Sequence, residues 1–104
     1  MKTKIEFSLV YKTGIKKTGK YTTIFFLNNQ TSTKLGITVT KKIGNAVIRN
    51  RTKRRYREIF RLHLKKLLPG FWIIFHANPN IVDVDYHEIE EDIINLLKNK
   101  QPYK

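Results

Sequence analysis

Residues 41–66 have the sequence KKIGNAVIRNRTKRRYREIFRLHLKK, and this stretch is the most informative part of the chain. Its apolar residues recur at helical spacing, which predicts one long helix from Ala46 to about Leu67. Asn45 is the expected N-cap, because its side-chain oxygen can accept a bond from a free backbone N–H of the first turn. Pro69 and Gly70 are expected to end the helix.

The two sides of this predicted helix differ sharply in character. With Val47 at zero and a turn of about 100° per residue, one set of side chains falls between about 100° and 220°: Ile48, Tyr56, Ile59, Phe60 and His63. A second set falls between about 280° and 40°: Arg51, Arg54, Arg57, Arg61 and Lys65. We predict that the first set packs on a sheet and that the second forms a basic ridge about 20 Å long.

The remaining segments are short helices and strands. Phe7, Val10 and Tyr11 lie at i, i+3 and i+4, which predicts a first helix that ends at Gly14. Further predictions follow in chain order: a basic loop at 16–20, a strand at 21–27, a turn at 28–32, a strand at 34–40 paired with the first as a hairpin, a central strand at 71–77, a loop at 78–80 and a helix at 86–98. Asp85 and Glu88 have capping-box spacing, and the last helix is expected to bury Ile89, Ile93, Leu96 and Leu97.

These elements predict a single α+β domain over residues 1–104. The predicted order is α-β-β-α-β-α, with helices packed on a small mixed sheet. The 104 residues suffice for one domain, and 40% hydrophobic residues argue against a disordered chain. Since the chain has no cysteine, disulfide scaffolds and thiol catalysis are excluded. The longest apolar run, residues 71–75, is too short to cross a bilayer, and no secretory signal begins the chain, so a cytoplasmic location is expected.

Charge gives the first indication of a partner. The formal net charge is +13, and residues 1–79 carry 18 basic side chains against two acidic ones. Residues 80–104 carry three basic and six acidic side chains, so the acidic part is a separate segment. Such an excess of positive charge favours a polyanionic partner, and nucleic acid is the first expectation. An anionic membrane or an acidic protein stays open as an alternative.

The type of basic residue narrows this expectation. Residues 41–66 hold six arginines and five lysines, whereas every basic residue elsewhere is lysine. Arginine favours forked, bidentate contacts with phosphate. The alternative is a solvated helix face held by ion pairs, but Glu58 is the only acidic residue of the stretch.

One motif combines three pieces of this stretch: Lys41-Lys42-Ile43-Gly44-Asn45-Ala46-Val47-Ile48-Arg49-Asn50-Arg51, then Lys53-Arg54, then residues 57–61 (REIFR). It resembles the signature of the bacterial ribonuclease P protein subunit. The opening residues 6–14 (EFSLVYKTG) are similar to the first helix of that family, and the last helix fits as well. Thr40 stands where serine is common, Arg55-Tyr56 where a more apolar pair is usual, and both ends of the chain are short.

The resemblance implies a subunit of the ribonucleoprotein that removes the 5′ leader from precursor tRNA. In that family the RNA subunit hydrolyses the phosphodiester with Mg²⁺, and the protein supplies binding. From the resemblance and from the position of the basic ridge, we expect ten residues to bind the catalytic RNA: Lys41, Lys42, Asn45, Arg49, Asn50, Arg51, Lys53, Arg54, Arg57 and Arg61. Phe7, Tyr11 and Phe25 match the family's cleft for the single-stranded leader, where stacking tolerates any base. Ordinary core packing is the alternative for these three aromatics.

Two residues of the motif, Asn50 and Gly44, each have more than one expected role. Asn50 falls at about 300° on the ridge side, where its amide can contact phosphate or sugar or remain in water. Gly44 is expected to supply a positive φ or to permit a close approach of the RNA backbone.

No catalytic residues are predicted in the protein. Asp83, Asp85, His76 and His87 lie near one another in sequence, and carboxylates of this kind can hold Mg²⁺. Asp85 is expected to be used as a helix cap, and between residues 7 and 82 the only carboxylate is Glu58. His63 is expected to be packed, and His76 and His87 receive no role.

Two other classes remain as alternatives. A ribosomal protein or an RNA chaperone would share the charge and the α+β fold. A helix-turn-helix DNA-binding protein needs a short helix before the arginine-rich one, and the strand-like residues 34–40 occupy that place.

Overall fold

The computed structural model describes residues 4–28, 32–63 and 70–98. Its helices are α1 (Lys4–Thr13), α2 (Ala46–His63) and α3 (Tyr86–Lys98). Its strands are β1 (Ile15–Thr18), β2 (Thr22–Leu27), β3 (Lys34–Thr38) and β4 (Trp72–Ala77). Two short 3₁₀ helices, η1 (Lys41–Ile43) and η3 (Pro79–Ile81), precede α2 and α3.

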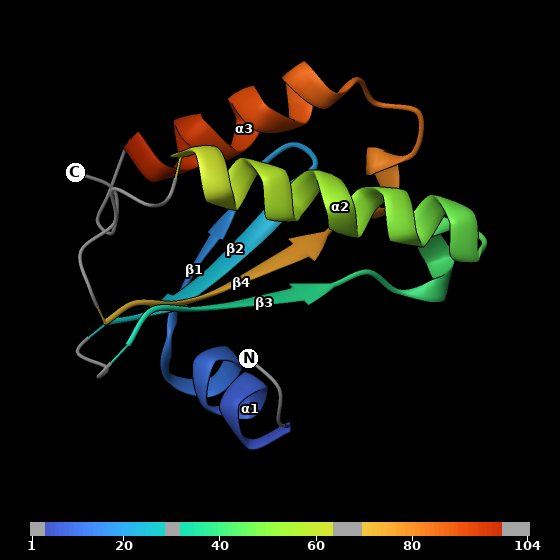
Figure 1. Cartoon of the computed structure of the whole chain (residues 1–104). Coiled ribbons are helices and arrows are strands. Elements are labelled where there is room, and N and C mark those ends of the chain that lie inside the picture. The colour runs from blue at the N-terminus through green and yellow to red at the C-terminus, as the bar shows by residue number, and fades with distance from the viewer. Residues whose placement is uncertain (1–3, 29–31, 64–69, 99–104) are drawn as a thin grey trace.

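The elements form three layers (Figure 1). α2 and α3 cover one face of the four-stranded sheet, and α1 lies alone against the other face. The predicted α+β class is confirmed, and so are the three helices and the mixed sheet. The predicted extension of α2 from residue 64 to 67 and its end at Pro69 lie outside the described residues.

β4 is central in the sheet, as its two apolar faces predict. The strand order is β1-β2-β4-β3, with β4 antiparallel to β2 and parallel to β3. A strand that is covered on both faces removes the most apolar surface from water, and Ile73, Ile74 and Phe75 are all fully buried.

Two predictions for the sheet are wrong. The segments at 21–27 and 34–40 do not form a hairpin, because β4 lies between β2 and β3 and pairs with both. The segment at 16–20 is not wholly a loop, because Ile15–Thr18 forms β1, an edge strand antiparallel to β2. The element order is therefore α-β-β-β-α-β-α, with one strand more than the sequence predicted.

The main core lies between the sheet and the helix pair α2 and α3. Tyr56 and Ile59 of α2 are fully buried against it, as the helical periodicity predicts. The hydroxyl of Tyr56 lies 2.7 Å from Thr22 Oγ1, and burial raises the pKa of Tyr56 far above its ordinary value. In α3, Ile89, Ile93 and Leu97 are buried as predicted, and Leu96 is half-buried.

Capping residues fix where the two long helices begin. Asn45 Oδ1 accepts a hydrogen bond of 3.0 Å from the backbone N–H of Ile48, which confirms Asn45 as the N-cap of α2. Gly44 has φ 152°, and a Cβ there would lie 3.0 Å from the side chain of Ile48. Asp85 Oδ2 accepts from the N–H of His87 at 3.2 Å and caps α3. Among the described residues, no helix has the length and apolar character to cross a membrane.

Candidate RNA-binding surfaces

The outer side of α2 presents the predicted arginines, here called the arginine ridge (Arg51, Arg54, Arg57 and Arg61). Arg54, Arg57 and Arg61 are exposed, as is the neighbouring Asn50. Within the described part of the chain, Arg54 and Arg57 form no ion pair or hydrogen bond. Their guanidinium groups are therefore open to an external anion.

The other two members of the arginine ridge are less open. Arg61 forms two hydrogen bonds with the carboxylate of Glu58, at 3.1 and 2.7 Å. These bonds lower the pKa of Glu58 and raise the pKa of Arg61. Arg51 is half-buried, and its Nε is buried without a hydrogen-bond partner among the described residues. Part of the Arg51 side chain is therefore covered, although its position on α2 groups it with the exposed arginines.

Two further arginines of α2 hold the surrounding backbone. Arg49 donates to the carbonyl of Gly44 at 2.9 Å, which secures the turn before α2. Arg55 donates to the carbonyl of Val84 at 3.1 Å, which joins α2 to the segment before α3. Of the other predicted RNA-binding residues, Lys41, Lys42 and Asn45 precede α2 and are exposed, and Lys53 lies within α2 and is half-buried. The RNA-binding role of all these residues stays a prediction.

The three predicted aromatics meet on the opposite face of the sheet and form what we call the aromatic patch (Phe7, Tyr11 and Phe25). The ring centroids of Tyr11 and Phe25 lie 4.7 Å apart in an edge arrangement, and those of Phe7 and Tyr11 lie 6.4 Å apart. Tyr11 is 36% exposed, while Phe7 and Phe25 are half-buried. α1 is held to the sheet by Val10, which is fully buried. The patch is therefore a surface feature rather than part of the main core.

Polar and charged side chains surround the aromatic patch. Lys16 Nζ lies 5.8 Å from the centre of the Phe25 ring, and the Tyr11 hydroxyl lies 2.8 Å from Thr38 Oγ1. On the same face of the sheet, Lys34 pairs with Glu6 and lies 4.8 Å from the ring centre of Trp72. None of these polar neighbours was predicted from the sequence to belong to the site. The strand register could have identified them, since residues two apart on a strand share a face.

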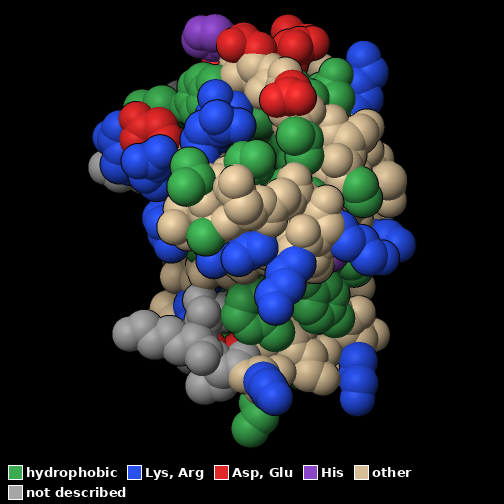
Figure 2. Space-filling view, turned by 90° about the vertical axis from the view of Figure 1, so that its right-hand side faces the viewer, with side chains coloured by type: hydrophobic (Ala, Val, Ile, Leu, Met, Phe, Trp, Pro, Cys, Tyr) green, Lys and Arg blue, Asp and Glu red, His purple; other side chains and the backbone are tan. Residues whose placement is uncertain are grey.

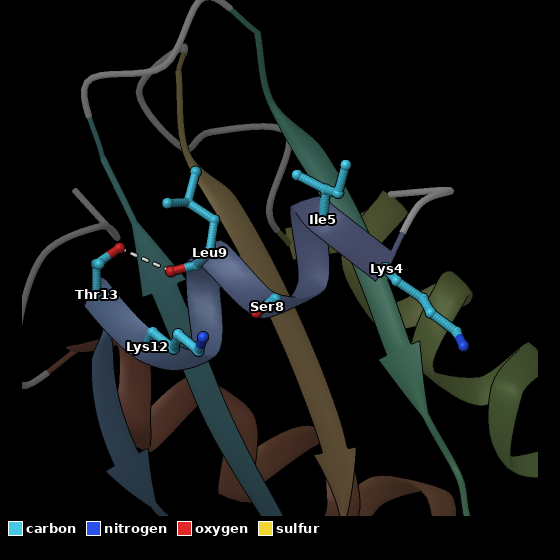
Figure 3. Close-up of a pocket in the computed structure, with 6 residues that line it drawn as sticks. All are labelled: Lys4, Ile5, Ser8, Leu9, Lys12 and Thr13. Carbon is cyan, nitrogen blue, oxygen red and sulfur yellow. Dashed lines mark hydrogen bonds between the residues drawn. The ribbon is translucent and has the colours of Figure 1, made fainter.

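The outer side of α1 carries a second apolar surface that the sequence analysis did not identify. Ile5 is 80% exposed and Leu9 is 41% exposed. Together with four polar side chains of the same helix they line a shallow hollow of about 460 Å³ (Figure 3); those four are Lys4, Ser8, Lys12 and Thr13. Helical spacing places these residues on the side of α1 that faces away from the sheet.

Acidic side chains are concentrated in one part of the chain, since six of the eight lie in residues 83–92. Most of the acidic side chains in view lie at the top of the molecule, where α3 lies, and Lys and Arg side chains are scattered over the rest of that face among hydrophobic and other groups (Figure 2). His63, predicted to be packed, is half-buried and pairs with Glu90 of α3, which also approaches His87. Among the described residues, no group of three or more His, Asp or Glu side chains is placed to hold a metal ion.

Comparison with known proteins supports one family. The family model "Ribonuclease P" matches residues 1–101. The "Ribonuclease P protein component" of Clostridioides difficile (strain 630) is 38% identical over 95 residues, which cover 89% of this chain and 83% of that protein. The protein of the same description from Alkaliphilus oremlandii is 42% identical over 94 residues, which cover 89% of this chain and 82% of that protein.

Solved structures agree with the sequence comparison. The RNase P protein of Staphylococcus aureus superposes with a TM-score of 0.90 at 30% identity, covering 100% of this chain and 96% of the other. The RNase P protein of Thermotoga maritima, solved with 1-(4-fluorophenyl)-2-thiourea, gives a TM-score of 0.86 at 31% identity, covering 97% and 99%. With its motif, fold and relatives in agreement, the chain belongs to the ribonuclease P protein family.

Proposed function

We propose that this chain binds two different parts of the ribonuclease P system, the catalytic RNA through the arginine ridge and the 5′ leader of precursor tRNA through the aromatic patch. The observation that carries the proposal is the separation of the two surfaces. The ridge lies on α2, above one face of the sheet, and the patch lies between α1 and the other face (Figure 1). One protein molecule can therefore contact both RNAs at once.

The arginine ridge suits a structured RNA. A-form helices give a side chain little access to their bases, so proteins recognise them by backbone shape and phosphate contacts. Arg54 and Arg57 are exposed, have no partner within the described ranges and lie about one helical turn apart. Their forked guanidinium groups suit bidentate contacts with phosphate oxygens along the RNA backbone.

The aromatic patch suits a single strand. Exposed rings stack with unpaired bases of any sequence, at about 1–3 kcal/mol per base. Tyr11 presents its ring at the surface while its hydroxyl is held by Thr38, so the ring is already fixed in position before RNA binds. Lys16 beside Phe25 adds a positive charge for the backbone of the same strand.

Our proposal assigns the phosphodiester hydrolysis to the RNA subunit and its Mg²⁺. Two of the carboxylates of this chain have structural roles in the fold. Asp85 caps α3, and Asp92 accepts hydrogen bonds from the backbone N–H groups of residues 20–22. The role of the protein is then to hold substrate and catalytic RNA together.

A binding experiment with the reconstituted holoenzyme tests this proposal. Precursor tRNA and mature tRNA are titrated separately at several salt concentrations, with and without this chain. We expect the protein to increase the affinity for precursor tRNA much more than that for mature tRNA. An equal effect on both substrates would refute leader binding and favour a general RNA-binding role, as in a ribosomal protein or chaperone.

A further inference from the structure

A row of polar residues adjoins the aromatic patch on the same face of the sheet. The strand register aligns side chains across the strands, so that Phe25, Ile74 and Gly36 form one row. α1 covers this row: the ring of Phe7 lies so close to Gly36 that a Cβ there would be 2.8 Å from it. The next row is polar, and we call it the polar row; it consists of Thr18, Thr23, His76 and Thr38.

His76 is the member of this row that has a buried ring nitrogen without a hydrogen-bond partner among the described residues. Thr23 donates to Asn78 Oδ1 at 2.9 Å, and Thr38 is bonded to the hydroxyl of Tyr11. The ring of His76 lies between these two threonines in the register and is partly exposed. Its Nδ1 is buried and has no hydrogen-bond partner among the described residues. The edge of the ring that reaches the surface therefore carries Nε2.

The surroundings of His76 determine which form of the ring is present. Burial and the nearby ammonium of Lys16 lower the pKa of His76, so the imidazole is neutral near pH 7. A neutral imidazole has one N–H donor and one acceptor nitrogen. With the proton on Nε2, the N–H bond points to the surface and only a lone pair is left in the interior, which avoids burying an unpaired donor.

We infer that His76 donates a hydrogen bond through Nε2 to the nucleotide that follows or precedes the one stacked on the aromatic patch. This inference rests on the proposed binding of the leader by that patch. Neighbouring rows on one face of a strand are about 6.6 Å apart, a distance that one step of an extended RNA strand can span. The shared chemistry is a hydrogen-bond acceptor, which the 2′-hydroxyl, a base carbonyl or a phosphate oxygen can supply.

Two substitutions of the same residue separate donation from ring packing. His76→Phe keeps an aromatic ring and removes the donor, while His76→Gln keeps an N–H donor. In the holoenzyme we expect His76→Phe to weaken binding of precursor tRNA about three- to tenfold, the effect of one lost hydrogen bond. His76→Gln should retain most of the affinity. Affinity for mature tRNA and for the catalytic RNA should stay as in wild type.

Modified leaders identify the acceptor when the wild-type and His76→Phe holoenzymes are compared. Precursors with one 2′-deoxy, abasic or methylphosphonate nucleotide, placed at each leader position in turn, are bound to the wild-type and His76→Phe holoenzymes. At one position a modification should weaken wild-type binding and add nothing to His76→Phe. The inference is overturned if no modification couples to His76, or if His76→Phe lowers thermal stability without any selective loss of precursor.

Tyr11→Ala, measured in parallel, keeps the two proposals apart. If Tyr11→Ala lowers precursor affinity and His76→Phe does not, the inference about His76 is wrong and leader binding stands. If neither variant changes the preference for precursor over mature tRNA, the proposed leader binding itself is wrong, and the inference fails with it.

Discussion

The arginine ridge and the aromatic patch are built in different ways. The ridge consists of long side chains that extend from one helix, and that helix is fixed by the buried residues on its opposite side. The patch consists of rings from α1 and β2 that contact each other across the chain. A helical period therefore suffices to specify the ridge, whereas the patch depends on how α1 docks on the sheet. The first should act by charge and the second by stacking, which experiment can separate.

The largest effect is expected from the ridge. Arg54→Glu with Arg57→Glu should weaken binding to the catalytic RNA by about 3 kcal/mol or more, since each charged hydrogen bond contributes about 1.5–3 kcal/mol. The slope of log affinity against log salt should become flatter by about 0.7–0.9 for each lost phosphate contact. Filter binding at a series of salt concentrations measures both quantities.

A matched control distinguishes the ridge from total charge. Lys4→Glu with Lys12→Glu makes the same change in net charge on the exposed side of α1. This control should affect affinity for the catalytic RNA much less. Equal losses in the two double variants would show that diffuse charge, rather than the arginine ridge, attracts the RNA.

The next effect concerns the patch. Tyr11→Ala should lower the affinity of the holoenzyme for precursor tRNA by about 1–3 kcal/mol through lost stacking. Affinity for mature tRNA, affinity for the catalytic RNA and the salt slope should hardly change. Because Tyr11 is 36% exposed, its loss should destabilise the fold much less than the roughly 3–5 kcal/mol expected for a core aromatic.

The control for Tyr11 lies on the same helix. Leu9→Ala removes an exposed apolar side chain from the far side of α1, beside the hollow in Figure 3. It should leave precursor affinity unchanged. A general loss of all three affinities in Tyr11→Ala, together with a large drop in thermal stability, would assign Tyr11 to packing.

These two regions also differ in how far the sequence could predict them. The side of α2 that carries Arg54 and Arg57 follows from a period of 3.6 residues, which the local sequence specifies. The partial burial of Arg51 does not follow from this period, which gives only the direction of the side chain from the helix axis. The polar neighbours of the aromatic patch, such as His76, required the strand register, and the predicted hairpin gave a wrong pairing for β3. Local periodicity predicted the three helices and three of the four strands, but not that β4 lies between β2 and β3.

A third prediction tests whether the ridge depends on the core beneath it. Tyr56→Phe removes the hydroxyl that contacts Thr22 and leaves a buried hydroxyl unpaired. We expect a loss of about 1–2 kcal/mol in the free energy of unfolding, measured by urea denaturation. Adding Thr22→Val should restore part of it, because both polar partners are then absent. The folded variants should bind the catalytic RNA as wild type does, and weaker binding would show that the ridge is sensitive to small shifts of α2.

A smaller effect is expected from the acidic segment, which belongs to neither region. Asp83→Asn with Asp85→Asn should reduce stability by at most about 1 kcal/mol, since asparagine caps a helix nearly as well as aspartate. Cleavage of precursor tRNA by the holoenzyme should proceed at the wild-type rate if these carboxylates bind no catalytic metal. Single-turnover rates at saturating enzyme measure this directly. A loss of rate that extra Mg²⁺ restores would place a functional metal ion at these residues.

The smallest effect concerns pH and separates the two regions once more. Guanidinium groups do not titrate near neutrality, so the ridge should contribute nothing to pH dependence between pH 5 and 8. The pKa of His76 is lowered in the folded protein by burial and by Lys16. A lowered pKa means that the unfolded chain binds the proton more readily than the folded protein does. The stability linked to neutral His76 is therefore fully present above the pKa of the unfolded chain, which is roughly 6.5. It is lost as the pH falls through the lower pKa of the folded protein. The melting temperature of the wild type should therefore fall more steeply than that of His76→Phe between pH 7 and pH 5. Parallel curves for the two proteins would show that the His76 ring is no harder to protonate in the folded state than in the unfolded chain.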